Sequence, residues 1–343
     1  MCRPLAGDAV LEDRPPSRTS PECPFAIRQL DQSSYLIREN DSFGEHPHIY
    51  AKIFIQPDGQ GVIVLSDTGV GTNTSKRNIW TLLESAINPG SKLPYLVILS
   101  HCHYDHILGL GQLPSNVDVS VVASSYAPSF ITPYSKLQQH SLCDFYSLAA
   151  PRYEISIWAH DQERLSFRDL DLDLDIRLLH TPGHTPDSLS WYHSKSRTLF
   201  VGDSFYQQTS YDTRTAPWGE EKSAPIIFTP EGNIFDWWGS LKTLIAFVEH
   251  ENETADTERP LVRLGAGHVT ASAEAYGFLL RVRAFAGRVM RDEIHSERMP
   301  DRQGLQVRHW KEDKDDRTAE FSLVAPLKLV DDARRQIPKD EWQ

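Results

Sequence analysis

The segment from residue 101 to residue 106 concentrates side chains that can bind a metal ion. Its sequence is His-Cys-His-Tyr-Asp-His, so three imidazoles and a carboxylate occur within six residues. Burying these groups together is costly unless a cation accepts their lone pairs, because each group loses its hydration. A polar surface loop is the alternative, but the flanking residues are strongly apolar. We therefore predict a metal site in this segment.

The apolar flanks predict that this cluster follows a buried strand. Residues 93–100 are mostly apolar and partly β-branched, and residues 107–110 are Ile-Leu-Gly-Leu. Loops that a rigid sheet holds in place are common positions for functional residues. Alternate side chains of an extended backbone point to the same side, so we expect His101 and His103 to lie together. Cys102 then points away, and we expect a packed thiol at this position instead of a ligand.

Three later segments each place a histidine or an aspartate after an apolar run and beside glycine. These residues are His184 in His-Thr-Pro-Gly-His-Thr-Pro, Asp203 in Phe-Val-Gly-Asp-Ser, and His268 in Ala-Gly-His-Val. Glycine lets the backbone approach a bound group closely. Together with the cluster, the segments supply seven donors. This is more than one tetrahedral ion can bind, and it fits two ions that share a carboxylate. Nitrogen and oxygen donors suit zinc, and they also accept manganese, iron or cobalt.

The remaining pattern predicts a strand-rich α/β protein. Apolar runs, continuous or alternating, predict strands, and apolar residues at helical spacing predict helices. We expect two packed sheets with helices outside. The expected strands are residues 25–30, 34–38, 50–56, 61–66, 93–100, 117–123, 169–179, 188–193 and 198–202, and the expected helices are residues 74–87, 233–249 and 271–291.

Two regions lack a regular hydrophobic pattern, and a third region contains alternating aspartates. Residues 125–163 are expected to be irregular and aromatic, and residues 204–232 to form a long connection. The alternating aspartates of residues 169–175 offer calcium ligands as one interpretation. A half-buried strand with one solvated acidic face is the interpretation that we prefer.

The charge and composition restrict the partners of the chain. Its 343 residues contain 35 Lys and Arg against 47 Asp and Glu, which gives a net charge of -12 without any basic run. This argues against nucleic acid, because phosphate binding usually requires a basic surface. No apolar run of about 18 residues predicts a membrane span, and no secretory signal is apparent. The four cysteines form no Cys-x-x-Cys pair, so we expect a cytoplasmic protein without a dense disulfide framework.

Taken as a set, the motifs resemble those of the metallo-beta-lactamase superfamily. The resemblance extends from about Asp67 to His268 and includes Asp-Thr-Gly, His-x-His-x-Asp-His, His-Thr-Pro-Gly-His-Thr, Gly-Asp and Gly-His in the family order. It implies a four-layer αβ/βα sandwich, with Asp67 bracing the ligand loops and His180 in a supporting position. The implied ligands are His101, His103 and His184 for the first ion, Asp105, His106 and His268 for the second, and Asp203 as the bridge.

One residue outside the ligand set narrows the expected reaction. Tyr206 follows Asp203 in Asp-Ser-Phe-Tyr, a spacing that resembles the N-acyl homoserine lactone lactonases. The resemblance implies that its phenol contacts the substrate carbonyl, where it could stabilise an oxyanion. A tyrosine packed under the long connection is the alternative. Asp105, besides binding metal, is placed to carry a proton to the leaving alkoxide, so we predict hydrolysis of a carboxylic ester or lactone by a hydroxide between two ions.

The chain adds segments to the lactonase pattern, so its pocket need not accept an acyl homoserine lactone. Aromatic residues in these additions would suit a larger apolar or polycyclic ester, or they belong to the core. The residues are Tyr126, Phe130, Tyr134, Phe145, Tyr146 and Trp218. Within the same superfamily, a thioesterase of glyoxalase II type and a sulfur dioxygenase with one iron remain as alternatives. The expected partner is therefore a small ester, lactone or thioester, and a homodimer is a candidate assembly.

We expect the chain to divide into an amino-terminal arm, a domain and a carboxyl-terminal tail. Residues 1–24 are rich in proline and charged residues and are predicted to be a disordered arm. Residues 25–300 contain all the motifs and are predicted to be the metallo-hydrolase domain. Residues 301–343 form a charged tail with an apolar stretch at 321–330, and we expect this tail to dock on the domain.

Overall fold

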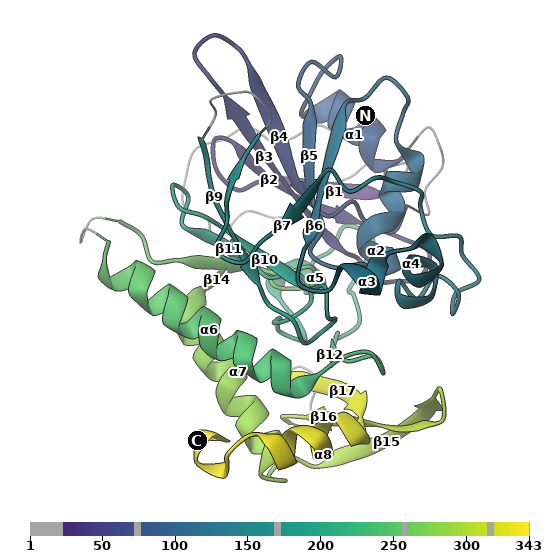
Figure 1. Cartoon of the computed structure of the whole chain (residues 1–343), viewed down its shortest axis with the longest axis vertical. Coiled ribbons are helices and arrows are strands. Elements are labelled where there is room, and N and C mark those ends of the chain that lie inside the picture. Colours follow the sequence, from purple (N-terminus) through teal and green to yellow (C-terminus); the bar gives the residue numbers. More distant parts are fainter. Residues whose placement is uncertain (1–22, 72–76, 168–172, 256–258, 314–318, 343) are drawn as a thin grey trace. The chain divides into compact units, whose positions relative to one another are not determined.

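The computed structural model describes residues 23–71, 77–167, 173–255, 259–313 and 319–342. Its contacts divide the chain into two compact units. The first unit comprises the chain up to residue 159 together with residues 164–174 and 211–221, and the second comprises residues 160–163, 175–210 and 222–343. Each unit has its own hydrophobic core. Figure 1 labels the helices and strands.

The first unit is built on a seven-stranded sheet in the order β1-β2-β3-β4-β5-β6-β7. Neighbours from β1 to β4 pair antiparallel, and neighbours from β4 to β7 pair parallel. All residues of β5 are buried between two parallel neighbours, which explains its uninterrupted apolar sequence. The strands are β1 (Phe25–Gln29), β2 (Ser34–Glu39), β3 (His48–Ile55), β4 (Gly61–Ser66), β5 (Tyr95–Ile98), β6 (Val119–Ser124) and β7 (Ile157–Ala159).

The helices of the first unit are short and partly differ from the sequence prediction. The predicted helix 74–87 begins only at Ile79, because the Asn78 side chain caps it by accepting from the Thr81 N–H at 3.0 Å. Residues 74–76 lie outside the described residues. The expectation that residues 125–163 are irregular is wrong, since α3, α4 and β7 form there. The helices are α1 (Ile79–Ala86), α2 (Tyr104–Ile107), η1 (Leu108–Gln112), α3 (Pro128–Ile131), α4 (Tyr134–His140) and α5 (Tyr211–Arg214).

Two further sheets contain the strands of the later part of the chain. One has the order β14-β13-β11-β10-β9-β8, and the other has the order β12-β17-β16-β15. Buried and partly exposed residues alternate along β9, as the acidic-face interpretation predicts, although residues 168–172 are outside the described residues. The strands are β8 (Arg164–Ser166), β9 (Asp173–His180), β10 (Leu189–His193), β11 (Thr198–Phe200), β12 (Ile226–Ile227), β13 (Arg263–Gly265), β14 (Ala273–Glu274), β15 (Ser296–Arg302), β16 (Leu305–Lys311) and β17 (Ser322–Pro326).

Two long helices, α6 (Ile234–Glu253) and α7 (Ala275–Met290), pack against each other in the second unit (Figure 1). They confirm the two helices expected in this part of the chain. The apolar stretch of the tail forms β17 and the start of α8 (Leu327–Gln336), and a short turn, η2 (Lys339–Trp342), follows. Val330 and Ala333 of α8 are buried in the core of this unit. β15 crosses residue 300, so the predicted division into domain and tail stays a prediction.

Among the residues that the structure describes, no helix combines the length and the apolar character needed to cross a membrane.

Candidate metal centre

In the first unit, the turn that follows β5 carries four of the predicted ligands. His101 and His103 precede α2, and Asp105 and His106 lie on it. All four side chains are buried. The ring centroids of His101 and His103 are 4.6 Å apart, so the two imidazoles lie together as their alternation predicts. Cys102 is buried in the hydrophobic core, which agrees with the expectation of a packed thiol.

Asp67, which follows β4, holds this turn in place. Its Oδ1 accepts the Ser100 N–H at 2.7 Å, and its Oδ2 accepts the Ser100 hydroxyl at 2.7 Å. The same Oδ2 lies 2.9 Å from His106 Nδ1, and the His106 carbonyl accepts from the Thr68 N–H. Because the Nδ1 of His106 faces this carboxylate, its Nε2 is the nitrogen available to a metal ion, and it lies 3.3 Å from Asp105 Oδ2. These contacts agree with the bracing role that the resemblance implies.

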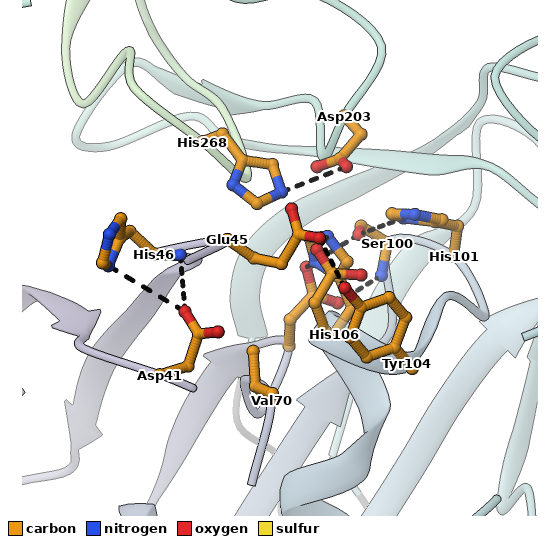
Figure 2. A network of polar contacts seen from close by, with 12 residues as sticks. Asp41, Glu45, His46, Val70, Ser100, His101, Tyr104, His106, Asp203 and His268 are labelled. Atoms are coloured by element: carbon orange, nitrogen blue, oxygen red, sulfur yellow. Dashed lines mark hydrogen bonds and ion pairs between the residues drawn. The ribbon is translucent and has the colours of Figure 1, made fainter. Parts of the chain in front are cut away.

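Tyr104, between His103 and Asp105, is anchored by its side chain. Its hydroxyl donates a hydrogen bond to the Glu45 carboxylate (Figure 2), and its N–H donates to the Ser141 carbonyl. Burial raises the pKa of the Tyr104 phenol far above its usual value, and the charges of Asp105 and Glu45 act in the same direction. The phenol therefore stays protonated and remains a donor. Glu45 was not predicted as a site residue, because it lies in a short polar loop that no motif marks.

The second unit supplies the other three predicted ligands from turns that follow strands. His184 follows β9, Asp203 follows β11 and His268 follows β13. Asp203 Oδ2 lies 3.3 Å from His268 Nε2 and 4.0 Å from His184 Nε2. Figure 2 shows the contact between Asp203 and His268. All three side chains are buried, and a hydrogen bond from the Gly267 N–H to the Gly202 carbonyl joins two of the turns.

The start of α6 fixes the turn that carries His184. Gly183 has a φ of +142°, and a Cβ built on it would lie 2.3 Å from the Trp237 Cα, so only glycine fits. The Gly183 carbonyl accepts from the Asn233 N–H, and the Trp237 indole donates to the Ser204 carbonyl at 2.7 Å. No sequence motif marks Trp237 as a functional residue. The structure places it beneath two ligand-bearing turns.

Each unit by itself thus gathers nitrogen and oxygen donors of the kind that divalent ions prefer. The ligand atoms within each pair lie within 4.8 Å of each other, and the pairs are His101 with His103, Asp105 with His106, and Asp203 with His268. Such buried groups fit a metal-binding role, because a cation compensates for their lost hydration. His180 belongs to no such group among the described residues. It ends β9, and its N–H donates to the Asp161 carboxylate at 2.9 Å.

Tyr206 is buried in the second unit, close to His268. The centroids of the two rings are 5.8 Å apart. The Tyr206 hydroxyl donates to the Pro225 carbonyl at 2.7 Å, and Pro225 lies in the long connection. A role for this phenol at a substrate carbonyl would therefore require exchange of that hydrogen bond, and the role stays a prediction.

The aromatic residues that were expected to suit a larger ester, or to belong to the core, occupy several places in the first unit. Phe145 and Tyr146 contact each other, whereas Trp218 stacks on His46. Phe130 stacks on His140. Tyr134 lines a cavity of about 430 Å³. The other residues that line this cavity are Ile131, Thr132, Leu137, Pro151, Arg152, Tyr153, Glu154, Ile155 and Trp158.

Comparison with protein families relates this geometry to known proteins. The model of the metallo-beta-lactamase superfamily matches residues 53–255. A protein from Aspergillus versicolor, named "Putative transcription factor avaE", is 25% identical over 330 residues, covering 90% of this chain and 88% of that protein. The "Probable metallo-hydrolase YflN" of Bacillus subtilis (strain 168) is 27% identical over 143 residues, covering 39% of this chain. The match spans about half of that relative, or 54% of its length.

Two solved structures of bacterial proteins have a similar fold. A beta-lactamase domain protein from Burkholderia ambifaria has a TM-score of 0.53 at 17% identity, covering 81% of this chain and 77% of the other. A metallo-beta-lactamase family protein from Thermus thermophilus has a TM-score of 0.50 at 16% identity, covering 78% and 85%. The mixed α/β fold expected from the motifs is thereby confirmed.

Proposed function

The chain belongs to the metallo-beta-lactamase superfamily, and on this basis we propose that it hydrolyses a carboxylic ester or a lactone with the help of two divalent metal ions. The observation that carries the proposal is the set of buried histidines and aspartates on turns that follow β5, β9, β11 and β13. A hydrolytic role is plausible for this family. The substrate class is the part that requires a test.

We assign the ligands by the order of the family motifs. In this order, the turn after β5 would supply donors for both ions, and His184, Asp203 and His268 would be the remaining ligands. Asp203 suits the bridging position, since its carboxylate lies near both His184 and His268. The first ion would be held by His101, His103 and His184, the second by Asp105, His106 and His268, and both by Asp203. Zinc is the expected metal, and manganese, iron and cobalt also accept these donors.

The bound ions would supply a hydroxide nucleophile at neutral pH and polarise the carbonyl of the substrate. The side chains of the protein would orient a ligand, transfer a proton and stabilise the oxyanion. Asp67 holds His106 in the tautomer that binds through Nε2. Asp105 would carry the proton of the nucleophile to the leaving alkoxide. Tyr206 would donate a hydrogen bond to the developing oxyanion after leaving the Pro225 carbonyl.

The alternatives predict different chemistry. A thioesterase of glyoxalase II type would act on S-lactoylglutathione, and a sulfur dioxygenase would hold a single iron and consume oxygen. The name of the Aspergillus versicolor relative refers to transcription. A net charge of -12 disfavours that role for this chain, because DNA binding depends on neutralising phosphates.

A substrate panel tests the proposal. Purified protein would be assayed with simple esters, γ- and δ-lactones, an acyl homoserine lactone, S-lactoylglutathione and a cephalosporin, with oxygen uptake measured in parallel. We expect turnover of esters or lactones, loss of turnover after chelation, and recovery with added zinc or manganese. Turnover of S-lactoylglutathione alone, or oxygen uptake with one iron per chain, would overturn the proposal in favour of an alternative.

A further inference from the structure

Four aromatic side chains of the first unit form a continuous cluster, which we call the aromatic platform. Tyr146 is its centre, with ring centroids 4.5 Å from Tyr104, 5.1 Å from Phe43 and 5.0 Å from Phe145. Phe43 also contacts Tyr104 edge to face at 5.4 Å. The platform therefore joins the loop that precedes β3, the first turn of α2 and the segment that follows α4.

Two members of the platform are unusually exposed. Phe43 is 38% exposed and contacts the buried Tyr104, and Phe145 is 68% exposed and contacts the partly buried Tyr146. Phe43 is also held by an ordered turn, since Asp41 Oδ1 accepts the N–H groups of Phe43 and Gly44 at 2.7 and 2.8 Å. Contiguous exposed apolar side chains in a soluble fold indicate a binding surface. A fixed aromatic ring binds at a low cost in conformational entropy.

The platform is connected directly to the predicted ligands. Tyr104 lies between His103 and Asp105 in the sequence, and its ring is buried beneath Phe43 and Tyr146. Its hydroxyl is held by Glu45, on the same loop as Phe43 (Figure 2). A group stacked on Phe43 and Phe145 would therefore lie against the side chains that surround the ligand turn.

The charges around the platform limit what it can bind. The loops that present it carry the carboxylates of Asp41, Glu45 and Asp144, and residues 40–47 and 141–150 contain no lysine or arginine. An anionic ligand would be repelled, whereas a neutral aromatic ring would stack on the exposed phenyl groups. We propose that the aromatic platform binds the planar aromatic part of a neutral ester or lactone substrate.

The first test measures binding without turnover. The probe is 2-acetylnaphthalene, a neutral aromatic ketone that cannot be hydrolysed, and binding to the whole protein is followed by calorimetry. We expect the double variant Phe43→Leu/Phe145→Leu to bind it about tenfold more weakly than the wild type, because each ring contact adds to affinity beyond area burial. Phe235→Leu, an exposed phenylalanine of α6, is the matched control and should bind like the wild type. Equal binding by all three proteins, or no binding by the wild type, would overturn the proposal.

The second test rests on the proposed ester hydrolysis and compares methyl 2-naphthoate with methyl octanoate. We expect kcat/KM for the naphthoate to fall about tenfold in the double variant, mainly through KM, and kcat/KM for the octanoate to change less than about twofold. Equal losses for both esters would contradict aromatic recognition. If no ester is hydrolysed by any protein, the proposed function fails, and the binding experiment still decides whether the platform recognises aromatic rings.

Discussion

At the scale of single residues, Asp67 determines how the first ligand turn is presented. Its two oxygens serve Ser100 and His106, so one carboxylate fixes both the backbone of the turn and the tautomer of a predicted ligand. This follows from the position of Asp67 after β4, where a φ of +64° directs its side chain to the neighbouring turn. Any effect of Asp67 on a bound ion would therefore act through His106 and its turn.

Asp67→Asn should weaken metal binding without unfolding the protein. The amide keeps one acceptor oxygen but places a donor near His106 Nδ1, which opposes the required tautomer. We expect the affinity for zinc to fall about 10- to 100-fold, measured by competition with a chromogenic chelator. Asp175→Asn is the control. Asp175 lies on β9, away from the ligand-bearing turns, and forms an ion pair with Lys195. Equal zinc affinities in both variants would refute the bracing role.

Tyr206→Phe separates two roles of one hydroxyl. If the phenol stabilises the oxyanion, turnover should fall about 10- to 100-fold with little change in KM. If it serves only the Pro225 carbonyl, turnover should stay unchanged, and the free energy of unfolding should fall by about 1 kcal/mol. We expect the first result. Steady-state kinetics and urea unfolding of the same preparation distinguish the two, and unchanged turnover would remove Tyr206 from the mechanism.

At the scale of elements, the contact between α6 and the turn at Gly183 is the most constrained feature near the predicted ligands. Gly183→Ala places a Cβ against the backbone of Trp237 at a φ of +142°. We expect it to destabilise the protein by about 1–3 kcal/mol and to weaken metal binding through His184. Gly239→Ala in α6 is the control, because nothing lies within 4 Å of its added Cβ.

The control variant should behave in the opposite way. Alanine favours a helix over glycine by about 1 kcal/mol, so Gly239→Ala should leave stability unchanged or raise it. Chemical unfolding of both variants provides the comparison. A Gly183→Ala protein with wild-type stability and wild-type zinc affinity would show that the turn does not depend on this contact.

Most strands and long helices could be predicted because their signals are local. The uninterrupted apolar run of β5 and the helical spacing of the apolar residues in α6 and α7 can be recognised from the sequence alone. The short helices α3 and α4 were missed, since neither has a side-chain cap and each spans at most two turns. Such elements are held by tertiary packing, which the sequence pattern does not display.

The candidate ligands could also be predicted because their signals are local. The residues that hold the ligand-bearing turns in place could not. His101 to His106 form a compact motif, and His184, Asp203 and His268 each follow an apolar run. Glu45 is far from its partner Tyr104 in the sequence, and no local pattern links the two. No local pattern marks Trp237 either, because its contact with Ser204 depends on how α6 packs.

At the scale of the whole molecule, the proposed ligands are buried side chains that are far apart in the sequence, so metal binding should stabilise the folded chain. A ligand that binds only the folded state raises the free energy of unfolding by about 2.7 kcal/mol at a concentration of 100 Kd. We expect removal of metal by chelation to lower the midpoint of thermal unfolding and added zinc to restore it. A midpoint that does not respond to either treatment would argue against a resident metal.

The central claim, that this chain holds two divalent ions through the seven assigned residues, is tested most directly by metal analysis. Wild-type protein and a His103→Ala variant would be saturated with zinc, freed of excess metal by gel filtration and measured by mass spectrometry of the metal. We predict two ions per chain in the wild type, and one or fewer in the variant with unchanged circular dichroism. A wild type that holds at most one ion, or a variant that retains two, would contradict the claim.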